Sequence, residues 1–334
     1  MQRTLGLVCA LAVAAIGCSD TEPTPQEIEE QGDDTAALTL EGEQITSIVD
    51  FDFVSPSFQS ELMFERLGLM WDAPGEGAIE LRFSSDGNTW SDWYAPTTVF
   101  SEEGSFAGHV DAPAGAEFFQ YRLASMDGAP TWVNVDAIEH LPPPIEPITE
   151  SDLGVAQQEL TADSIPIHSR AEWGARPPQC SSGTNTAITR ATIHHTVTPT
   201  VDSMGAKKRL RQIQAFHMFS RGWCDIGYNF LVSRDGRVWR GRGKNVVGAH
   251  VANNNTNNVG ISFMGTYTST KANLAQRCRA AKLLAWLHEK HPALHLNRTD
   301  VRGHREFGGT SCPGNSLYNQ IGGILSLAKQ GGCN

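Results

Sequence analysis

Two adjacent histidines, His194 and His195, lie in a short run of β-branched residues at positions 191–196. Successive side chains of a β-strand point to opposite faces, so only one of the two histidines can enter a given site. Far downstream the chain adds His304 and, eight positions later, Cys312. Two imidazole nitrogens and one thiolate suit catalytic zinc, with a fourth position open for water. A histidine pair alone is more often structural or solvated, so the metal hypothesis depends on the downstream residues.

Charge is distributed unevenly along the 334-residue chain, which is long enough for two folded units. From residue 165 onward there are 22 Lys and Arg against 7 Asp and Glu, whereas the first 164 residues hold 4 basic and 30 acidic side chains. The basic half favours an anionic polymer as partner. The alternative is a basic surface that has no such partner.

The first 17 residues have the features of a signal peptide. Arg3 precedes an apolar run over residues 5–16 that is too short for a bilayer, where about 20 residues are needed. The following Gly17-Cys18 resembles the end of a bacterial lipobox, which implies lipidation of Cys18 and membrane anchoring in the cell envelope (periplasm or outer membrane). Plain secretion is the alternative, because leucine is more usual where Ala15 stands. Residues 18–44 are acidic and predict a disordered tether.

Residues 45–141 predict an all-β, sandwich-like accessory domain, because β-rich runs at 78–83 and 118–123 are separated by turn signals. Residues 86–93 resemble the tryptophan-containing hairpins of β-sandwich modules attached to bacterial amidases. Exposed tryptophans there could stack on sugar rings. The alternative is that the four tryptophans pack in the core or the hairpin: Trp71, Trp90, Trp93 and Trp132. A proline-rich and acidic linker is expected over residues 142–164.

Residues 165–334 alternate between strand and helix patterns, which predicts a mixed α/β domain with a central sheet and flanking helices. After the histidine strand we expect a helix at 207–219, a hairpin whose turn is 233–236, a strand at 258–264, and helices at 271–290 and 316–329.

Seven motifs in this half occur in a characteristic order. They are Trp173-Gly174-Ala175-Arg176, Ile193-His194-His195-Thr196, 223–230, 241–243, Gly248-Ala249-His250, 260–265 and 303–314. Together they resemble a peptidoglycan recognition protein domain of the type-2 N-acetylmuramoyl-L-alanine amidase family, over roughly residues 165–330. The resemblance implies cleavage of the amide between the lactyl group of N-acetylmuramic acid and L-alanine. An unstrained amide is a poor electrophile, and bulk water, with a pKa of about 15.7, is a poor nucleophile. Zinc would activate the water by lowering the pKa of the bound molecule to about 7.

The resemblance also implies residue roles. His194, His304 and Cys312 match the ligands of one zinc ion, which leaves His195 for packing. Tyr228 matches an active-site tyrosine that would orient the water or stabilise the oxyanion. Thr310 stands where some relatives carry lysine, as an auxiliary catalytic residue.

Substrate recognition is expected from a groove near these residues. Gly222 and Trp223 match a pair that accompanies a preference for meso-diaminopimelate stems in peptidoglycan or muropeptides. Arg240 and Arg242 are candidates for the extra carboxylate, since a guanidinium binds carboxylate through two hydrogen bonds; alternatively they contact solvent or the glycan. His250 is a further groove candidate. We expect a monomer that binds no nucleic acid.

Four of the seven cysteines remain after Cys9, Cys18 and Cys312 are assigned to the signal peptide, the lipid and the metal. An even number in an exported protein indicates two disulfides. Cys180–Cys224 with Cys278–Cys333 is the preferred pairing, and the other two connectivities stay open.

Three functions are compatible with these features. The first is a zinc amidase acting on peptidoglycan. The second is a recognition module that binds without cutting, as relatives lacking the cysteine ligand do; Cys312 argues against it. The third is a wall anchor with structural zinc, which would more often have four protein ligands.

Overall fold

The structure is a computed structural model that describes residues 54–60, 63–73, 78–125, 132–139, 141 and 165–333. The predicted signal peptide, tether and linker, including Cys18, lie outside these residues. The strands are β1 Phe58–Gln59, β2 Arg66–Asp72, β3 Ala78–Ser84, β4 Thr97–Glu102, β5 Ser105–Asp111, β6 Phe118–Ser125, β7 Trp132–Ile138, β8 Ile167–His168, β9 Arg190–His195, β10 Phe230–Val232, β11 Val238–Arg240, β12 Asn258–Phe263 and β13 Val301–Gly303. The helices are α3 Arg170–Trp173, α4 Ala206–Ala215, a π-helical turn Phe216–Ser220, α5 Leu274–Lys290, a 3-10 turn His304–Phe307, α6 Asn315–Tyr318 and α7 Ile321–Lys329.

The described part of residues 54–141, here called the β-unit, contains two antiparallel sheets with strand orders β4-β5-β2-β7 and β1-β6-β3. Both sheets contribute to one hydrophobic cluster, in which Trp71 stacks on Phe106 with ring centroids 5.3 Å apart. The hairpin tryptophans are not in this cluster. The guanidinium of Arg82 instead lies 4.9 Å from the ring centroid of Trp90 and 4.6 Å from that of Trp93. These rings are therefore already stacked on a cation of the same chain.

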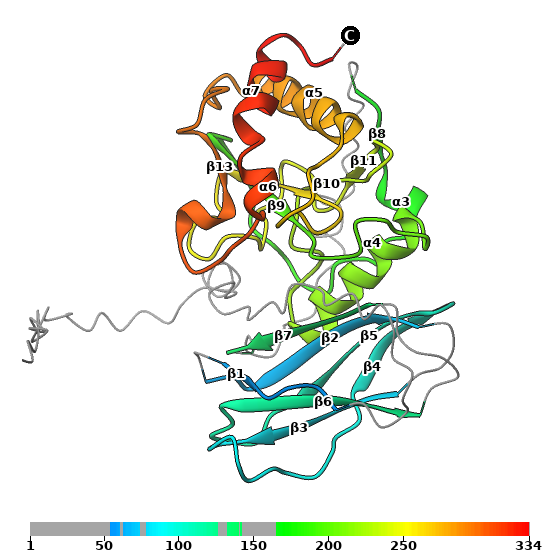
Figure 1. The fold of residues 1–334 in the computed structure, drawn as a ribbon. Coiled ribbons are helices and arrows are strands. Elements are labelled where there is room, and N and C mark those ends of the chain that lie inside the picture. Colours follow the sequence, from blue (N-terminus) through cyan, green and yellow to red (C-terminus); the bar gives the residue numbers. More distant parts are fainter. Residues whose placement is uncertain are drawn as a thin grey trace, which may run out of the picture.

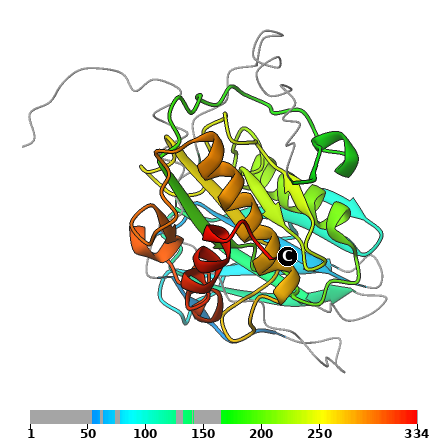
Figure 2. The same cartoon turned by 90° about the horizontal axis from the view of Figure 1, so that it is seen from above.

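Residues 165–333, here called the C-terminal unit, form a six-stranded sheet with the order β13-β9-β12-β10-β11-β8. Helices α5 and α7 cover one face and pack over a single apolar cluster with strands β9, β10 and β12. Figure 2 shows these two helices lying across the sheet. Helix α4 covers the opposite face. The mixed α/β architecture with flanking helices is thus confirmed for this half.

Strand β9 lies inside this sheet between β12 and β13, parallel to both. Its residues alternate in direction: Ile193 is buried in the cluster under α5 and α7, and His194 lies on the other face. The register pairs Gly303 with Ile193. His304, the next residue after β13, is therefore brought beside His194 by strand pairing alone.

The β-unit packs directly on α4 and its π-helical continuation, as Figure 1 shows. Met70, Phe100 and Trp132 from the β-unit share one buried cluster with Leu210 and Phe216 of this helical segment. The sheet β4-β5-β2-β7 is consequently covered on both faces. The molecule is built in layers, with α4 packed between a sheet of each unit.

Two helix predictions need correction in detail. The helix expected at 207–219 is α-helical to Ala215 and then widens into the π-helical turn. The helix expected at 316–329 is two helices, α6 and α7. Gln320 lies between them, and its side chain accepts from the N–H and donates to the carbonyl of Ala272. This tertiary contact fixes the break.

The preferred disulfide pairing is confirmed. Cys180 is bonded to Cys224 and Cys278 to Cys333, with Cα atoms 4.8 Å and 5.3 Å apart, within the usual range. Among the described cysteines, Cys312 is the one outside a disulfide, and it is buried.

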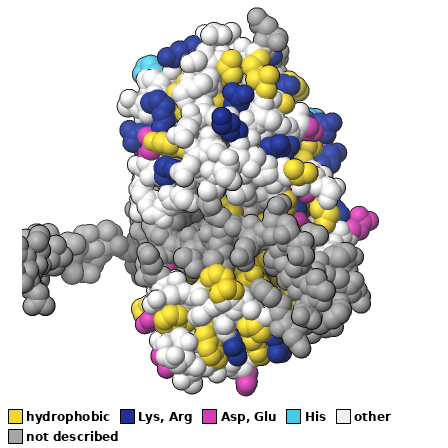
Figure 3. All heavy atoms as spheres, viewed as in Figure 1, with side chains coloured by type: hydrophobic (Ala, Val, Ile, Leu, Met, Phe, Trp, Pro, Cys, Tyr) yellow, Lys and Arg dark blue, Asp and Glu magenta, His cyan; other side chains and the backbone are white. Residues whose placement is uncertain are grey.

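Lys and Arg side chains are scattered over the C-terminal unit on the face drawn in Figure 3. This agrees with the basic composition of that half. No helix in the described ranges is both long and apolar enough to cross a bilayer.

Gly68 on β2 is required for the packing between the two units. A Cβ atom there would lie 2.7 Å from Cε2 of Phe216 and 3.2 Å from Cδ1 of Ile138. We predict that Gly68→Ala lowers the free energy of unfolding by about 1–3 kcal/mol through overpacking. Chemical denaturation followed by tryptophan fluorescence measures the change.

Gly322→Ala is the matched control, because Gly322 is exposed on α7 and nothing lies near its missing Cβ. Alanine should there raise helix stability by about 0.5–1 kcal/mol. Equal effects of the two substitutions would contradict the close packing at Gly68.

Candidate metal centre

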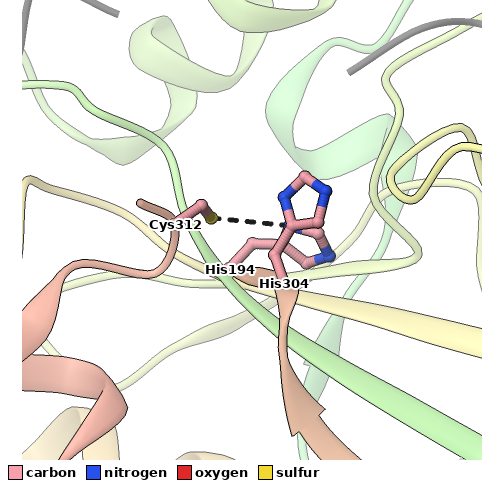
Figure 4. Close-up of side chains that lie close together, drawn as sticks. All are labelled: His194, His304 and Cys312. Carbon is pink, nitrogen blue, oxygen red and sulfur yellow. Dashed lines mark hydrogen bonds between the residues drawn. The ribbon is translucent and has the colours of Figure 1, made fainter. Parts of the chain in front are cut away.

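Three buried side chains meet at the edge of the six-stranded sheet. His194 comes from β9, His304 from the turn after β13, and Cys312 from the loop that follows this turn. One potential ligand atom from each lies within 4.8 Å of the other two. Figure 4 shows the three side chains converging. Sγ of Cys312 is 3.7 Å from Nδ1 of His194. These distances suit three ligands around one ion.

Hydrogen bonding determines which nitrogen of His194 is available. Nε2 of His250 lies 3.1 Å from the carbonyl oxygen of Asn258, which can only accept, so this nitrogen carries the proton. Nδ1 of neutral His250 then accepts from Nε2 of His194 at 3.0 Å. The Nδ1 lone pair of His194 is therefore directed to Cys312 and His304. Such a partner on the far nitrogen is typical of metal-ligating histidines.

The histidines of the site are neutral near pH 7. Burial lowers the pKa of His304 to about 4 and that of His250 to about 3. For His194, burial is again the largest cause, followed by the neighbouring His304, and its pKa lies well below the ordinary value. Neutral imidazole is the form that binds a metal ion. At neutral pH a metal ion would therefore not have to displace a proton from either imidazole ligand.

A pocket surrounds the three ligands. It is lined by Asn134, Asp136, His194, His195, Thr196, Val197, His217, Arg221, Trp223, Tyr228, Ala249, His304, Thr310 and Cys312. The ring of Tyr228 lies 5.4 Å from that of His194, centroid to centroid. Thr310 is tied to the ligand loop, since its hydroxyl accepts from the N–H of Cys312 at 3.1 Å. The pocket therefore combines a ligand set with a phenol and a hydroxyl.

Comparisons with known proteins match the C-terminal unit. The family model "N-acetylmuramoyl-L-alanine amidase" matches residues 184–315. Peptidoglycan-recognition protein SC2 of Drosophila simulans is 39% identical over 158 residues, which cover 47% of this chain and 85% of that protein. The chain belongs to the peptidoglycan recognition protein and type-2 amidase family. Peptidoglycan recognition protein 1 of Bos taurus is 37% identical over 171 residues, 51% of this chain and 86% of that protein. The solved structure of Drosophila PGRP-LB is 34% identical, covers 47% of this chain and 92% of its own, and has a TM-score of 0.43.

Of the residues expected to bind substrate, some line the pocket and others do not. Trp223 lines the pocket, and its ring packs against that of His217 with centroids 4.7 Å apart. Gly222, Arg240 and Arg242 are not among the lining residues. The guanidinium of Arg242 donates to the carbonyls of Ile226 and Val247 and to the hydroxyl of Ser182. Arg242 is thereby committed to holding loops together instead of facing a ligand.

His250 also needs a new assignment. Our expectation placed it in the substrate groove, but it is 1% exposed and bonded to His194. Its ring fits between two glycines, since a Cβ on Gly248 or Gly260 would lie 2.3 Å or 2.5 Å from its Cδ2 atom. His250 thus contacts the candidate metal ligand His194 from behind and does not line the pocket.

His195 is not part of the three-residue ligand set, as strand alternation predicts. Its Nδ1 accepts from the N–H of Tyr267 at 3.1 Å, and burial lowers its pKa to about 3.

Four polar or charged pocket residues lie outside the motifs singled out from the sequence. His217 and Arg221 lie in and just after the π-helical turn, which directs them to the pocket. Their proximity to Trp223 in the sequence is the signal that could have found them. Asn134 and Asp136 come from β7 of the β-unit. No local pattern around them predicts that contact.

Loss of His250 should weaken metal binding. We predict that His250→Ala lowers zinc affinity by about 10–100-fold, because His194 loses the partner that fixes its ring and its proton. Competition with a chromophoric chelator measures the affinity. His288→Ala is the control: that histidine also contacts a backbone carbonyl but lies on α5. Equal zinc affinity in wild type and His250→Ala would refute the positioning role.

Stability should depend on pH through His195. Its folded pKa of about 3 lies below the unfolded value, so the unfolded state binds protons first as pH falls below about 6.5. The contribution of His195 to the free energy of unfolding is therefore fully present above about pH 6.5 and is lost progressively toward pH 3. For metal-free protein, His195→Asn should reduce the slope of the free energy of unfolding against pH by about 1.4 kcal/mol per pH unit.

Unfolding curves between pH 8 and pH 4.5 test this, and the pH 8 values separate the packing cost of the substitution from titration. An unchanged slope in the variant would show that His195 does not contribute.

Proposed function

We propose that this chain is a zinc-dependent N-acetylmuramoyl-L-alanine amidase, which hydrolyses the amide between the lactyl group of N-acetylmuramic acid and L-alanine in peptidoglycan. One observation carries the proposal: His194, His304 and Cys312 form a buried three-ligand set inside a pocket. The family membership reported above supports the choice of substrate.

The donor set fits zinc. Two neutral imidazoles and one cysteine held outside the disulfides are typical ligands, and three protein ligands leave one coordination position for water or substrate. When bound, zinc supplies Lewis acidity, which lowers the pKa of water and polarises a carbonyl.

The residues of the chain would bind and orient the reacting amide. The phenol of Tyr228 lies beside the ligand set and can donate a hydrogen bond to the carbonyl oxygen as negative charge develops there. Nδ1 of His217 accepts from the N–H of Gly227 at 3.1 Å, so Nε2 carries the proton of this neutral ring. His217 can therefore donate to a carbonyl of the substrate. Thr310 has no charge to offer, so its hydroxyl supports the Cys312 loop.

Recognition without cleavage is the second candidate. The printed names of the relatives favour it, since those relatives are called recognition proteins. The cysteine ligand and the adjacent tyrosine favour catalysis, because binding alone requires neither. A purely structural zinc is disfavoured by the three-ligand set.

Two finer parts of the proposal concern substrate and location. A preference for diaminopimelate stems rests on Gly222 and Trp223, with Arg242 withdrawn as carboxylate ligand because its donors are used within the protein. Anchoring to the cell envelope through lipidated Cys18 stays a prediction.

Cys312→Ser tests the catalytic assignment. We expect loss of amide hydrolysis together with loss of zinc, because serine is a poor neutral ligand, whereas muropeptide binding is largely kept. Hydrolysis is followed by chromatographic release of stem peptide, zinc by atomic absorption, and binding by calorimetry.

Tyr228→Phe is the matched control, since it should keep its zinc and lose activity by about 10²–10³-fold if the phenol stabilises the oxyanion. Full hydrolysis by folded, zinc-free Cys312→Ser would overturn the proposal. Zinc-loaded wild type that binds muropeptides and never cleaves them would establish the recognition function instead.

A further inference from the structure

The two faces of β7 serve different units of the molecule. Val133, Val135 and Ala137 are buried in the cluster between the sheets of the β-unit. The intervening residues, Trp132, Asn134 and Asp136, contact or face the C-terminal unit. This is the alternation expected of a strand buried on both sides. It delivers two polar side chains from the β-unit to the pocket of the metal centre.

Polar contacts hold the β-unit in one position on the C-terminal unit. Buried Arg209 pairs with Asp72 at 2.5 Å, and Arg221 pairs with Asp136 at 2.9 Å. The side-chain amide of Gln212 donates to the backbone carbonyls of Trp71 and Phe106. Buried charges and amides lose much stability when unpaired, so these contacts select one docking arrangement. The position of β7 at the pocket is therefore fixed.

Asn134 has an unused acceptor at this pocket. The residue is 2% exposed, and its Nδ2 donates to Oδ1 of Asp136 at 3.1 Å, which fixes the orientation of the amide. Its Oδ1 has no donor within hydrogen-bonding distance among the described residues. A buried carbonyl without a donor is uncommon in proteins. At a ligand pocket it indicates an acceptor kept for the ligand.

We propose that Asn134 is a substrate-binding residue of this site and that β7 forms one wall of the catalytic pocket. The group it accepts from is an amide N–H, which muropeptides carry in the stem peptide and in the acetamido group of the sugar. Asp136 is a positioning residue, because it holds both the amide of Asn134 and the guanidinium of Arg221. The ligand class rests on the proposed function.

This assignment changes the role of the β-unit. It is part of the binding site itself and not only a separate module for holding the cell wall. The tryptophans of its hairpin, the other candidates for glycan contact, are stacked on Arg82.

The test measures binding without requiring hydrolysis. The full chain with Cys312→Ser is titrated with N-acetylmuramoyl-tripeptide in a calorimeter, with and without Asn134→Leu, which keeps the branched shape of the side chain and removes the acceptor together with the Nδ2 donor to Asp136. We expect the dissociation constant to rise by about 3–10-fold, the usual effect of one lost hydrogen bond. In the otherwise unchanged chain, which keeps Cys312, Asn134→Leu should raise the KM of muropeptide hydrolysis more than it lowers kcat.

Ser105→Ala is the matched control, because Ser105 is buried at the same interface, bonds to Asp72, and does not line the pocket. It should leave the dissociation constant unchanged. Asn134→Ala is the second variant if leucine prevents folding, with thermal unfolding as the check. Titration with the free tripeptide and with N-acetylmuramic acid shows which amide N–H is bound.

The outcomes separate the two proposals. Unchanged affinity and KM in folded Asn134→Leu, with an active wild type, overturn the role of Asn134 and leave the amidase standing. Weaker binding by Asn134→Leu in a chain that never hydrolyses muropeptides supports the role of Asn134 and removes the amidase. Absence of muropeptide binding in every variant overturns both.

Discussion

The hydrogen bond from Nε2 of His194 to Nδ1 of His250 is the interaction on which the candidate metal centre depends. It decides the tautomer of His194 and so the direction of its free lone pair. It exists because Asn258, at the start of β12, offers a carbonyl to His250, and because two glycines leave room for the ring. A sheet strand thereby controls the protonation of a ligand on its neighbouring strand, and burial keeps all the rings neutral.

Opposite charges on the two halves of the chain are used partly within the molecule. Arg209 and Arg211 of α4, and Arg221 after it, pair with Asp72, Glu102 and Asp136 of the β-unit. The excess of basic residues indicated a partner that is an anionic polymer, but these arginines meet an acidic neighbour in the same chain. Net charge of a segment therefore gives only an upper bound on the charge available to a partner.

Local signals predicted much of this structure. Because side chains alternate along a strand, only one of the adjacent residues His194 and His195 could enter the site. His304 and Cys312 completed the predicted ligand set, and the structure brings these residues together with His194. The position of His250 was predicted wrongly, because its exposure depends on three segments meeting. Asn134 could not be found at all, since β7 reaches the pocket only through docking of one unit on another. Tertiary packing, which no local pattern encodes, decided both.

Helix α4 and the turn after it, packed between two sheets, also have an evolutionary consequence. Domains joined by a linker can be exchanged by recombination, because neither depends on the surface of the other. Here Gly68 leaves no room for a side chain beside Phe216, and the amide of Gln212 donates to two backbone carbonyls across the interface. A lineage that swapped the β-unit for another module would have to alter this helical segment as well. The two units should therefore be inherited together, with substitutions on one side compensated on the other.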